Sequence, residues 1–155
     1  MSAPWLKNFC GFQTTDFEMM QMPHPNIEFG IHVTIRSTQI GAIVGSLVGP
    51  ASAFLLQGKT DHKSLTNAFV DGGLRGAFWG VVFGPIWTFL QVRNMNNIQL
   101  YDRCYRMRFD KNQLFHDRAC ILSGTVGALT NGQLGFVVGL DLAAALSTIL
   151  GKTWL

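Results

Sequence analysis

The chain has 155 residues, of which 14% are charged and 48% hydrophobic, and its formal net charge is +3. Typical soluble domains carry about 25% charged residues, so this composition argues against a soluble enzyme and favours a membrane protein.

Residues 1–33 are predicted to form an N-terminal arm outside the membrane domain. Residues 1–35 contain a single Lys or Arg, Lys7, against three acids, Asp16, Glu18 and Glu28. This balance is unlike that of an Arg-rich transit peptide or a secretory signal, so we expect any targeting signal to be internal.

The first predicted membrane span covers residues 36–57. Between Arg36 and Lys59 lie 22 uncharged residues, and about 20 helical residues suffice to cross a hydrocarbon core of about 30 Å. Glycine recurs at every fourth position of this span, at Gly41, Gly45 and Gly49. Each glycine costs about 1 kcal/mol relative to alanine in a water-soluble helix. The stripe therefore indicates close contact with another helix.

The second predicted span, residues 70–93, repeats the first. A shift of 35 residues places the three glycines and Pro50 of the first span on Gly76, Gly80, Gly84 and Pro85. Ser64 is predicted to cap the helix that leads into this span. The two prolines are expected to kink or end their helices. The bulky side chains between the glycines are expected to face lipid or a partner protein; they are Phe78, Trp79, Phe83, Trp87 and Phe89.

Residues 94–117 form a basic loop in this prediction. Together with Arg93 and Arg118 it holds half of the Lys and Arg residues of the chain, and Tyr101, Tyr105 and Phe109 recur in it at helical spacing. Two interpretations stay open: an amphipathic helix in the headgroup region of a membrane, and a solvated loop.

The third and fourth spans are predicted at residues 118–130 and 134–151. The apolar stretch from Ala119 onward is too long for one span, and TNGQ, at residues 130–133, is the turn-like sequence that divides it. Small residues again follow a step of four, with glycines at Gly127, Gly135 and Gly139.

The predicted fold is an all-α membrane domain, residues 34–152, in which four transmembrane helices form a bundle and pack through glycine-stripe faces. Lipid provides little hydrophobic gain when two apolar helices associate, so small residues that allow close backbone approach hold such helices together. A small-residue face can also line a substrate groove, and we favour the packing interpretation.

Asp141 is predicted to be an intramembrane acid. A carboxylate inside a span costs about 2.5–3.5 kcal/mol on insertion scales, so it usually faces protein or water and has a partner. One interpretation is a groove acid or a proton-linked group. The interpretation that we favour is an ion pair or hydrogen bond between helices, with candidate partners Arg118, Arg36 and Arg75, or a position near a membrane surface because the last span is short.

Arg36, Arg75 and Arg118 open three of the spans and are candidate contacts for phospholipid headgroups, cardiolipin included. Anchoring without lipid specificity is the alternative. We predict no catalytic, cofactor-binding or metal-binding residue, because the histidines have no acid or cysteine at ligand spacing and no Ser/His/Asp set or phosphate loop is visible. Aromatic residues interleave the basic loop as in nucleic-acid binders, but its neighbours are membrane spans, so lipid or a partner subunit is expected there and not nucleic acid. The spans lack buried polar groups, so no small-molecule substrate is expected either.

Repeated glycine-stripe spans, a charged loop and the segment SGTVGALTNGQLGFVVGLDLAAALSTILGK resemble the four-span mitochondrial inner-membrane translocase family. That family includes core subunits of the presequence and carrier translocases and a relative that is an accessory subunit of respiratory complex I. The resemblance covers residues 34–152. It implies four helices, a multi-pass location in the mitochondrial inner membrane, no cofactor, and other subunits of a large membrane complex as partners.

Within the family, translocase members carry acidic residues in a lipid-facing groove. Here Asp141 is the one clear acid in the spans, with Asp71 near the start of the second. We therefore favour a non-catalytic accessory subunit of the complex I membrane arm, with a subunit of a protein translocase as the alternative. Counting basic residues places the termini in the matrix, whereas the resemblance implies the intermembrane space, and we follow the resemblance.

Overall fold

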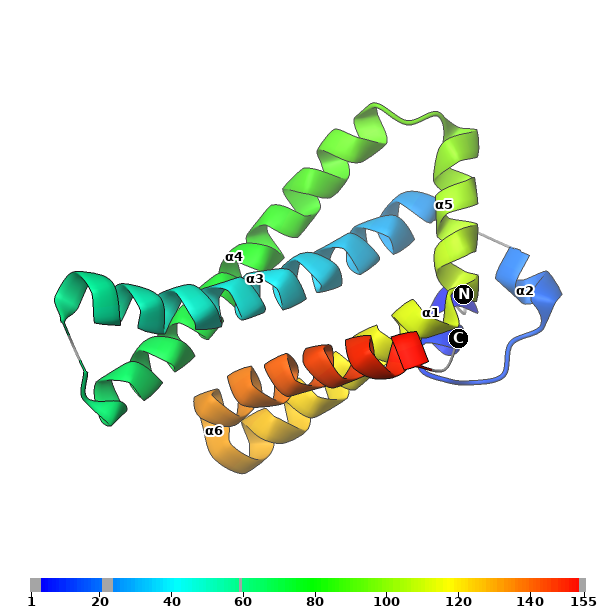
Figure 1. Cartoon of the computed structure of the whole chain (residues 1–155). Coiled ribbons are helices and arrows are strands. Elements are labelled where there is room, and N and C mark those ends of the chain that lie inside the picture. The colour runs from blue at the N-terminus through cyan, green and yellow to red at the C-terminus, as the bar shows by residue number, and fades with distance from the viewer. Residues whose placement is uncertain (1–3, 21–23, 59, 154–155) are drawn as a thin grey trace.

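The computed structural model describes residues 4–20, 24–58 and 60–153, and every element in these ranges is an α-helix (Figure 1). In chain order the helices are α1 (Pro4–Phe9), α2 (Asp16–Met20), α3 (Pro25–Gln57), α4 (His62–Arg93), α5 (Asn97–Phe109) and α6 (Lys111–Thr153). The expectation of an all-α chain is confirmed.

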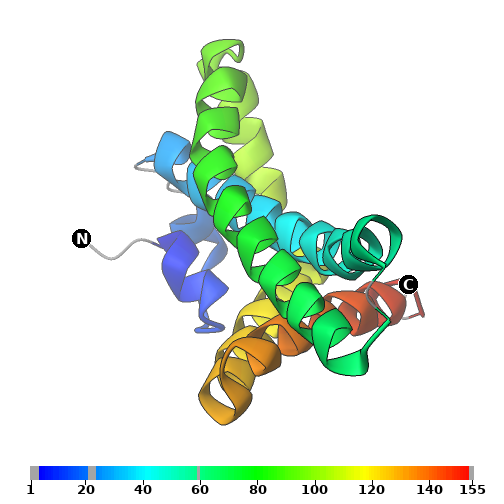
Figure 2. The ribbon, with the colours of Figure 1, turned by 90° about the vertical axis from the view of Figure 1, so that its left-hand side faces the viewer.

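Helices α3 and α4 form a long hairpin in which the two helices cross (Figure 2). Pro25 stands in the first turn of α3, where its fixed φ suits a helix start, and Gly58, with φ of 60°, ends the helix. Helix α4 starts at His62 after Asp61, so Ser64 lies inside the helix and the prediction that it caps α4 is wrong. Neither helix ends at its proline, because α3 continues to Gln57 and α4 to Arg93.

Helix α6 is itself a hairpin of two helices. Asn131 and Gly132 have non-helical backbone angles, and Gly132 has a positive φ of 59°, so the chain reverses within the predicted turn at residues 130–133. The helix begins at Lys111, seven residues before the predicted third span. A side-chain cap explains this start, because the Asp110 Oδ1 accepts a hydrogen bond of 3.1 Å from the backbone N–H of Gln113.

The segment predicted as a basic loop is largely helical. Its helix α5 buries Leu100 and Cys104 against Phe29 of α3, which rules out the solvated-loop interpretation for residues 97–109. At its start Asn96 and Gln99 form a reciprocal capping box. The charged residues of this segment do not prevent it from forming a helix. They show only where the apolar stretch of α4 ends.

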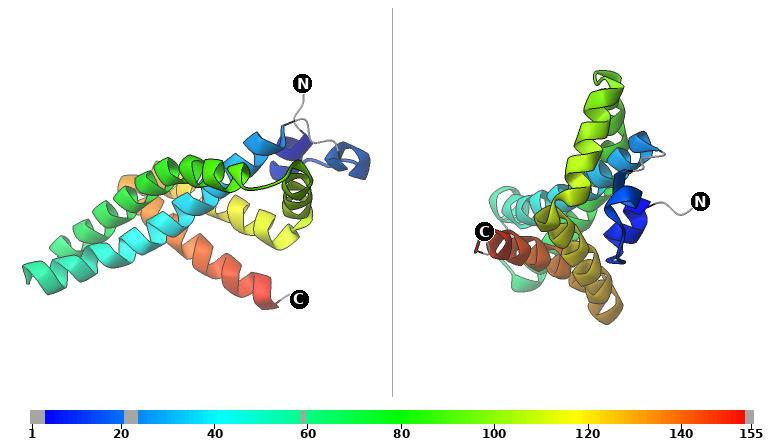
Figure 3. Two further views of the ribbon diagram at one scale, coloured as in Figure 1. Left: turned by 90° about the horizontal axis from the view of Figure 1, so that it is seen from above. Right: turned by 90° about the vertical axis from the view of Figure 1, so that its right-hand side faces the viewer.

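The two hairpins point the same way. The α3–α4 connection and the turn within α6 lie toward one end of the molecule, whereas α1, α2, α5 and the last turns of α6 lie at the opposite end (Figures 1 and 3). This arrangement is that of two helical hairpins whose open ends are covered by short helices.

Burial is inverted relative to a water-soluble protein. The buried hydrophobic side chains include small ones such as Ala42, Ala77 and Ala144, and the group of fully buried side chains includes Glu28 and Asp117. The five bulky residues expected to face outward on α4 are between 55% and 66% exposed. The chain exposes 10250 Å², against about 7,800 Å² for a compact soluble monomer of its 17.1 kDa mass.

Two stretches of the described chain are long and apolar enough to cross a membrane. They are Pro25–Leu56 and Lys111–Ile149. In the most apolar 18 residues of each stretch, 22% and 28% respectively are buried. The second contains the reversal at Asn131 and Gly132 and so holds the third and fourth predicted spans. Helix α4, the second predicted span, is not among these stretches, because glycines, tryptophans and Arg75 lower its mean hydropathy.

Candidate functional site

The first glycine seam joins α3 to α4. A Cβ atom added at Gly41 would lie within 3.0 Å of the Gly76 carbonyl oxygen, and one added at Gly45 equally close to the Gly72 carbonyl oxygen. The same backbone proximity holds at Gly49, Gly72, Gly76, Gly80 and Gly84. All six glycines of the first two predicted stripes therefore lie at a helix–helix contact, and Gly72 is a seventh member that the repeat did not reveal.

A second seam closes the α6 hairpin on itself. A Cβ atom at Gly127 or Gly135 would meet the backbone carbonyl of the other, and one at Gly139 would meet the Ser123 carbonyl. The bundle is therefore built from two hairpins, each with its own seam. Between the hairpins, Gly73 of α4 lies against the Val137 side chain, and Ala42, Ala77 and Leu140 form a small cluster.

A buried ion pair fastens α5 to α3. The Arg108 guanidinium donates to both carboxylate oxygens of Glu28 at 2.5 Å, and both side chains are 1% exposed. Arg108 also donates to the Met19 carbonyl of α2. Nearby, the Cys104 thiol donates to the Pro25 carbonyl at 3.4 Å, and burial, reinforced by the Glu28 charge, raises the pKa of Cys104 to about 12. This thiol is therefore a neutral packing group.

A second buried polar group links α3 to the start of α6. The Asp117 Oδ1 accepts a hydrogen bond of 3.1 Å from Gln39 Nε2, and its Oδ2 lies 3.9 Å from His32 Nδ1. Both residues of the His32–Asp117 pair are nearly fully buried. Neither Asp117 Oδ2 nor His32 Nδ1 has a hydrogen-bond partner among the described residues, so the hydrogen bond from Gln39 is the direct polar link between α3 and α6 at this point.

His116 and Ser147 join the two halves of α6, with 2.5 Å between His116 Nδ1 and Ser147 Oγ. The Ser147 hydroxyl also donates to the Ala143 carbonyl at 2.6 Å. Together these contacts tie the first half of α6 to the second. In the described ranges no group of three or more His, Cys, Asp or Glu side chains is placed to hold a metal ion.

The three predicted headgroup arginines have different surroundings. Arg118 donates to the backbone carbonyls of Asn8 and Phe9, so its guanidinium ties α1 to α6, and its headgroup contact stays a prediction. Arg75 is exposed and shares a surface pocket with Asp71. Arg36 is exposed at a groove between α3 and the second half of α6.

Asp141 faces the same groove as Arg36. The Ser46 side chain of α3 interacts with its carboxylate, and its Oδ1 is buried without a hydrogen-bond partner among the described residues. Within the described ranges Asp141 forms no ion pair with Arg36, Arg75 or Arg118. The predicted ion pair is therefore absent from the described residues, and the hydrogen-bond interpretation stays a prediction.

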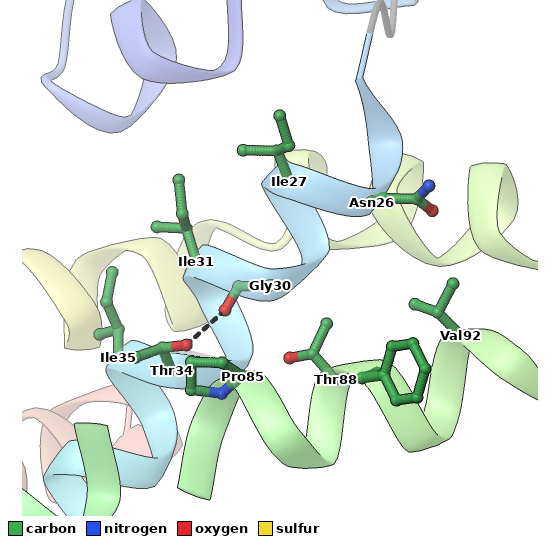
Figure 4. A pocket seen from close by; sticks show the side chains of 10 residues that line it. Asn26, Ile27, Gly30, Ile31, Thr34, Ile35, Pro85, Thr88 and Val92 are labelled. Carbon is green, nitrogen blue, oxygen red and sulfur yellow. Dashed lines mark hydrogen bonds between the residues drawn. The ribbon is translucent and has the colours of Figure 1, made fainter. Parts of the chain in front are cut away.

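An apolar groove of about 630 Å³ lies between the N-terminal part of α3 and the C-terminal part of α4 (Figure 4). Ile27, Ile31 and Ile35 lie along α3, with Pro85, Thr88 and Val92 along α4. Thr34 and Thr88 donate to carbonyls of their own helices at 2.7 and 2.8 Å. Their hydroxyls are thus internally satisfied, and the groove presents an almost wholly apolar surface.

The sequence did not indicate the ion pair between Glu28 and Arg108. The two residues are 80 positions apart, one in α3 and the other in α5, and nothing in a single sequence pairs them. One contact could have been predicted from local spacing. His116 and Cys120 are four residues apart on one helix face, and the structure places their Nε2 and Sγ atoms 3.9 Å apart.

A family model described as "Protein of unknown function (DUF1757)" matches residues 5–150. The search of curated proteins finds no match to the chain.

Proposed function

The chain belongs to the DUF1757 family, described as proteins of unknown function, and we propose that it is a four-span membrane protein that serves as a non-catalytic structural subunit of a larger complex. The proposed complex is the membrane arm of respiratory complex I in the mitochondrial inner membrane.

Inverted burial is the observation that carries the membrane part of this proposal. Leu55, Leu56 and Leu129 are 76%, 84% and 82% exposed, although exposed apolar patches of this kind are unfavourable in water. The glycine seams leave these large side chains pointing outward on both hairpins. A hydrocarbon phase, or apolar partner helices, would cover them without cost.

The structural role is supported by what the polar groups do. Glu28, Arg108 and Arg118 are used in contacts between helices, and His116 and Ser147 join the two halves of α6. Hairpins with an outward apolar face, held together by such contacts, suit a scaffold. The choice of complex I and of mitochondria follows from the family resemblance of residues 34–152.

A translocase subunit is the second candidate, and Asp141 is the observation that favours it. Its carboxylate lines an open groove of about 600 Å³ between α3 and α6, where a positively charged segment would find a matching charge. An accessory subunit of complex I, in contrast, would have no need for an accessible carboxylate at this position.

The test uses the tagged full-length chain expressed in its own mitochondria. Alkaline extraction should leave it in the membrane pellet, and native gels in mild detergent should place it in a megadalton assembly with complex I activity. A photo-crosslinker at Leu47, which lines the Asp141 groove, should capture only resident subunits. Capture of precursors in transit would replace the accessory-subunit proposal with the translocase, and release by alkaline extraction would overturn both.

A further inference from the structure

We propose that the groove between α3 and the second half of α6 binds one zwitterionic phospholipid of the phosphatidylethanolamine type, with its phosphate at Arg36, its ammonium at Asp110 and an acyl chain in the apolar part of the groove. This inference rests on the proposed membrane insertion and is independent of membership in complex I.

The groove has two adjoining compartments of opposite polarity. The polar compartment, of about 320 Å³, is lined by side chains that include Asp110, Asn112 and Gln113. The deeper compartment, of about 600 Å³, is lined largely by apolar side chains that include Ile40, Ile43 and Leu47. The two share Arg36, Gln39, His116 and Thr148. Both volumes are typical of ligand sites, and the polar-to-apolar order is that of an amphiphile.

The charges of the polar compartment select the headgroup. Arg36 is exposed and has no ion pair within the described ranges, and a guanidinium matches a phosphate with two parallel hydrogen bonds. Asp110 is also exposed. Its Oδ1 caps α6, and a carboxylate has further acceptor sites for an ammonium group.

The second acid of the compartment, Asp117, is already engaged by Gln39 and lies against His32. A headgroup with one negative and one positive charge therefore complements Arg36 and Asp110 together. A purely anionic headgroup, such as that of cardiolipin, would bring its phosphates against two carboxylates.

The polar and apolar compartments follow each other along the helices as the headgroup and acyl chain do in a lipid. Asp110 joins α5 to α6 and so lies at the end of the molecule where α5 lies (Figure 1). Arg36, in the first half of α3, lines the same polar compartment. The apolar compartment continues from there toward Leu47 and Phe69. This proposal places the polar compartment at headgroup depth and the apolar one at acyl depth. Asp141 also lines the deeper compartment, where Ser46 contacts it.

The experiment is native mass spectrometry of the full-length chain in mild detergent, titrated with phosphatidylethanolamine, phosphatidylglycerol or cardiolipin. Wild-type protein should retain one phosphatidylethanolamine in preference to the anionic lipids, and soluble phosphoethanolamine should not displace it. Arg36→Gln should weaken phosphatidylethanolamine retention about tenfold or more, because it removes a charge-assisted hydrogen-bond pair. Asp110→Asn, which keeps the helix cap, should shift the preference toward phosphatidylglycerol.

Two controls keep the result interpretable. Arg75→Gln removes an exposed arginine that does not line this groove and should leave retention unchanged. Ala145→Phe fills the deeper compartment and should lower retention of all three lipids. Equal retention of the three lipids by wild type, or equal losses in Arg36→Gln and Arg75→Gln, would overturn the proposal. The readout is lipid selectivity, so failure of this proposal can be told apart from failure of the chain to comigrate with complex I.

Discussion

Gly76→Ala should separate α3 from α4, although alanine is the better helix former. The new Cβ atom would lie 2.7 Å from the Gly41 carbonyl carbon and 3.1 Å from the Gly45 Cα. Carbon atoms pack at about 3.5–4.0 Å, so the helices must move apart by roughly 1 Å at the centre of their seam. These neighbours are backbone atoms, which cannot rotate away.

The magnitude follows from two opposing effects. Inserting a methyl group into a packed interface costs about 1–3 kcal/mol, and a gap of about 1 Å forfeits up to half of each nearby van der Waals contact. The gain in helix propensity offsets at most about 1 kcal/mol. We expect a net loss of about 1–2 kcal/mol in the free energy of unfolding, which corresponds to a fall of roughly 2–8 °C in Tm for a chain of this size.

Thermal unfolding in detergent, followed by tryptophan fluorescence, measures this change. Gly124→Ala is the matched control, because a Cβ there would have its nearest contact at 3.5 Å from a Phe136 ring carbon, an ordinary packing distance. It should be neutral or stabilising. A Tm for Gly76→Ala equal to that of wild type, or an equal fall in both variants, would refute the argument that backbone contact at glycine holds the hairpin.

Three further predictions concern the Glu28–Arg108 ion pair, the α6 turn and the thiols. Glu28→Gln should lower the free energy of unfolding by about 3–5 kcal/mol, because it leaves a buried guanidinium unpaired, whereas Arg106→Ala, which breaks an exposed pair, should cost less than about 1 kcal/mol in the same denaturant titration. Gly132→Ala should cost about 1–3 kcal/mol, since φ of 59° with ψ of −137° is unfavourable for a residue with a Cβ; an unchanged denaturation midpoint would contradict this. Maleimide at pH 7 to 9 should label exposed Cys10 and spare Cys104, because a thiol with its pKa raised to about 12 stays protonated throughout that range; mass spectrometry of the labelled peptides reads the outcome, and labelling of Cys104 in folded protein would count against its burial.

Local pattern was enough to indicate the helices and their contact faces. Glycines at steps of four, such as Gly41 and Gly45, mark a face without side chains, and in an apolar helix the favourable use of such a face is contact with another backbone. The turn at Asn131 and Gly132 was also readable, since both residues favour non-helical conformations. These features depend on neighbours within one or two helical turns, which is why the sequence alone determined them.

Only the tertiary structure decided which groups meet across the hairpins. Arg118 precedes a span much as Arg36 does, yet Arg118 binds the carbonyls of Asn8 and Phe9 while Arg36 faces an open groove. The Glu28–Arg108 pair joins two segments that no sequence period connects. Charges act over a few ångströms in space irrespective of their separation along the chain, so their partners are fixed by how α5 and the two hairpins pack and not by the order of residues in any one helix.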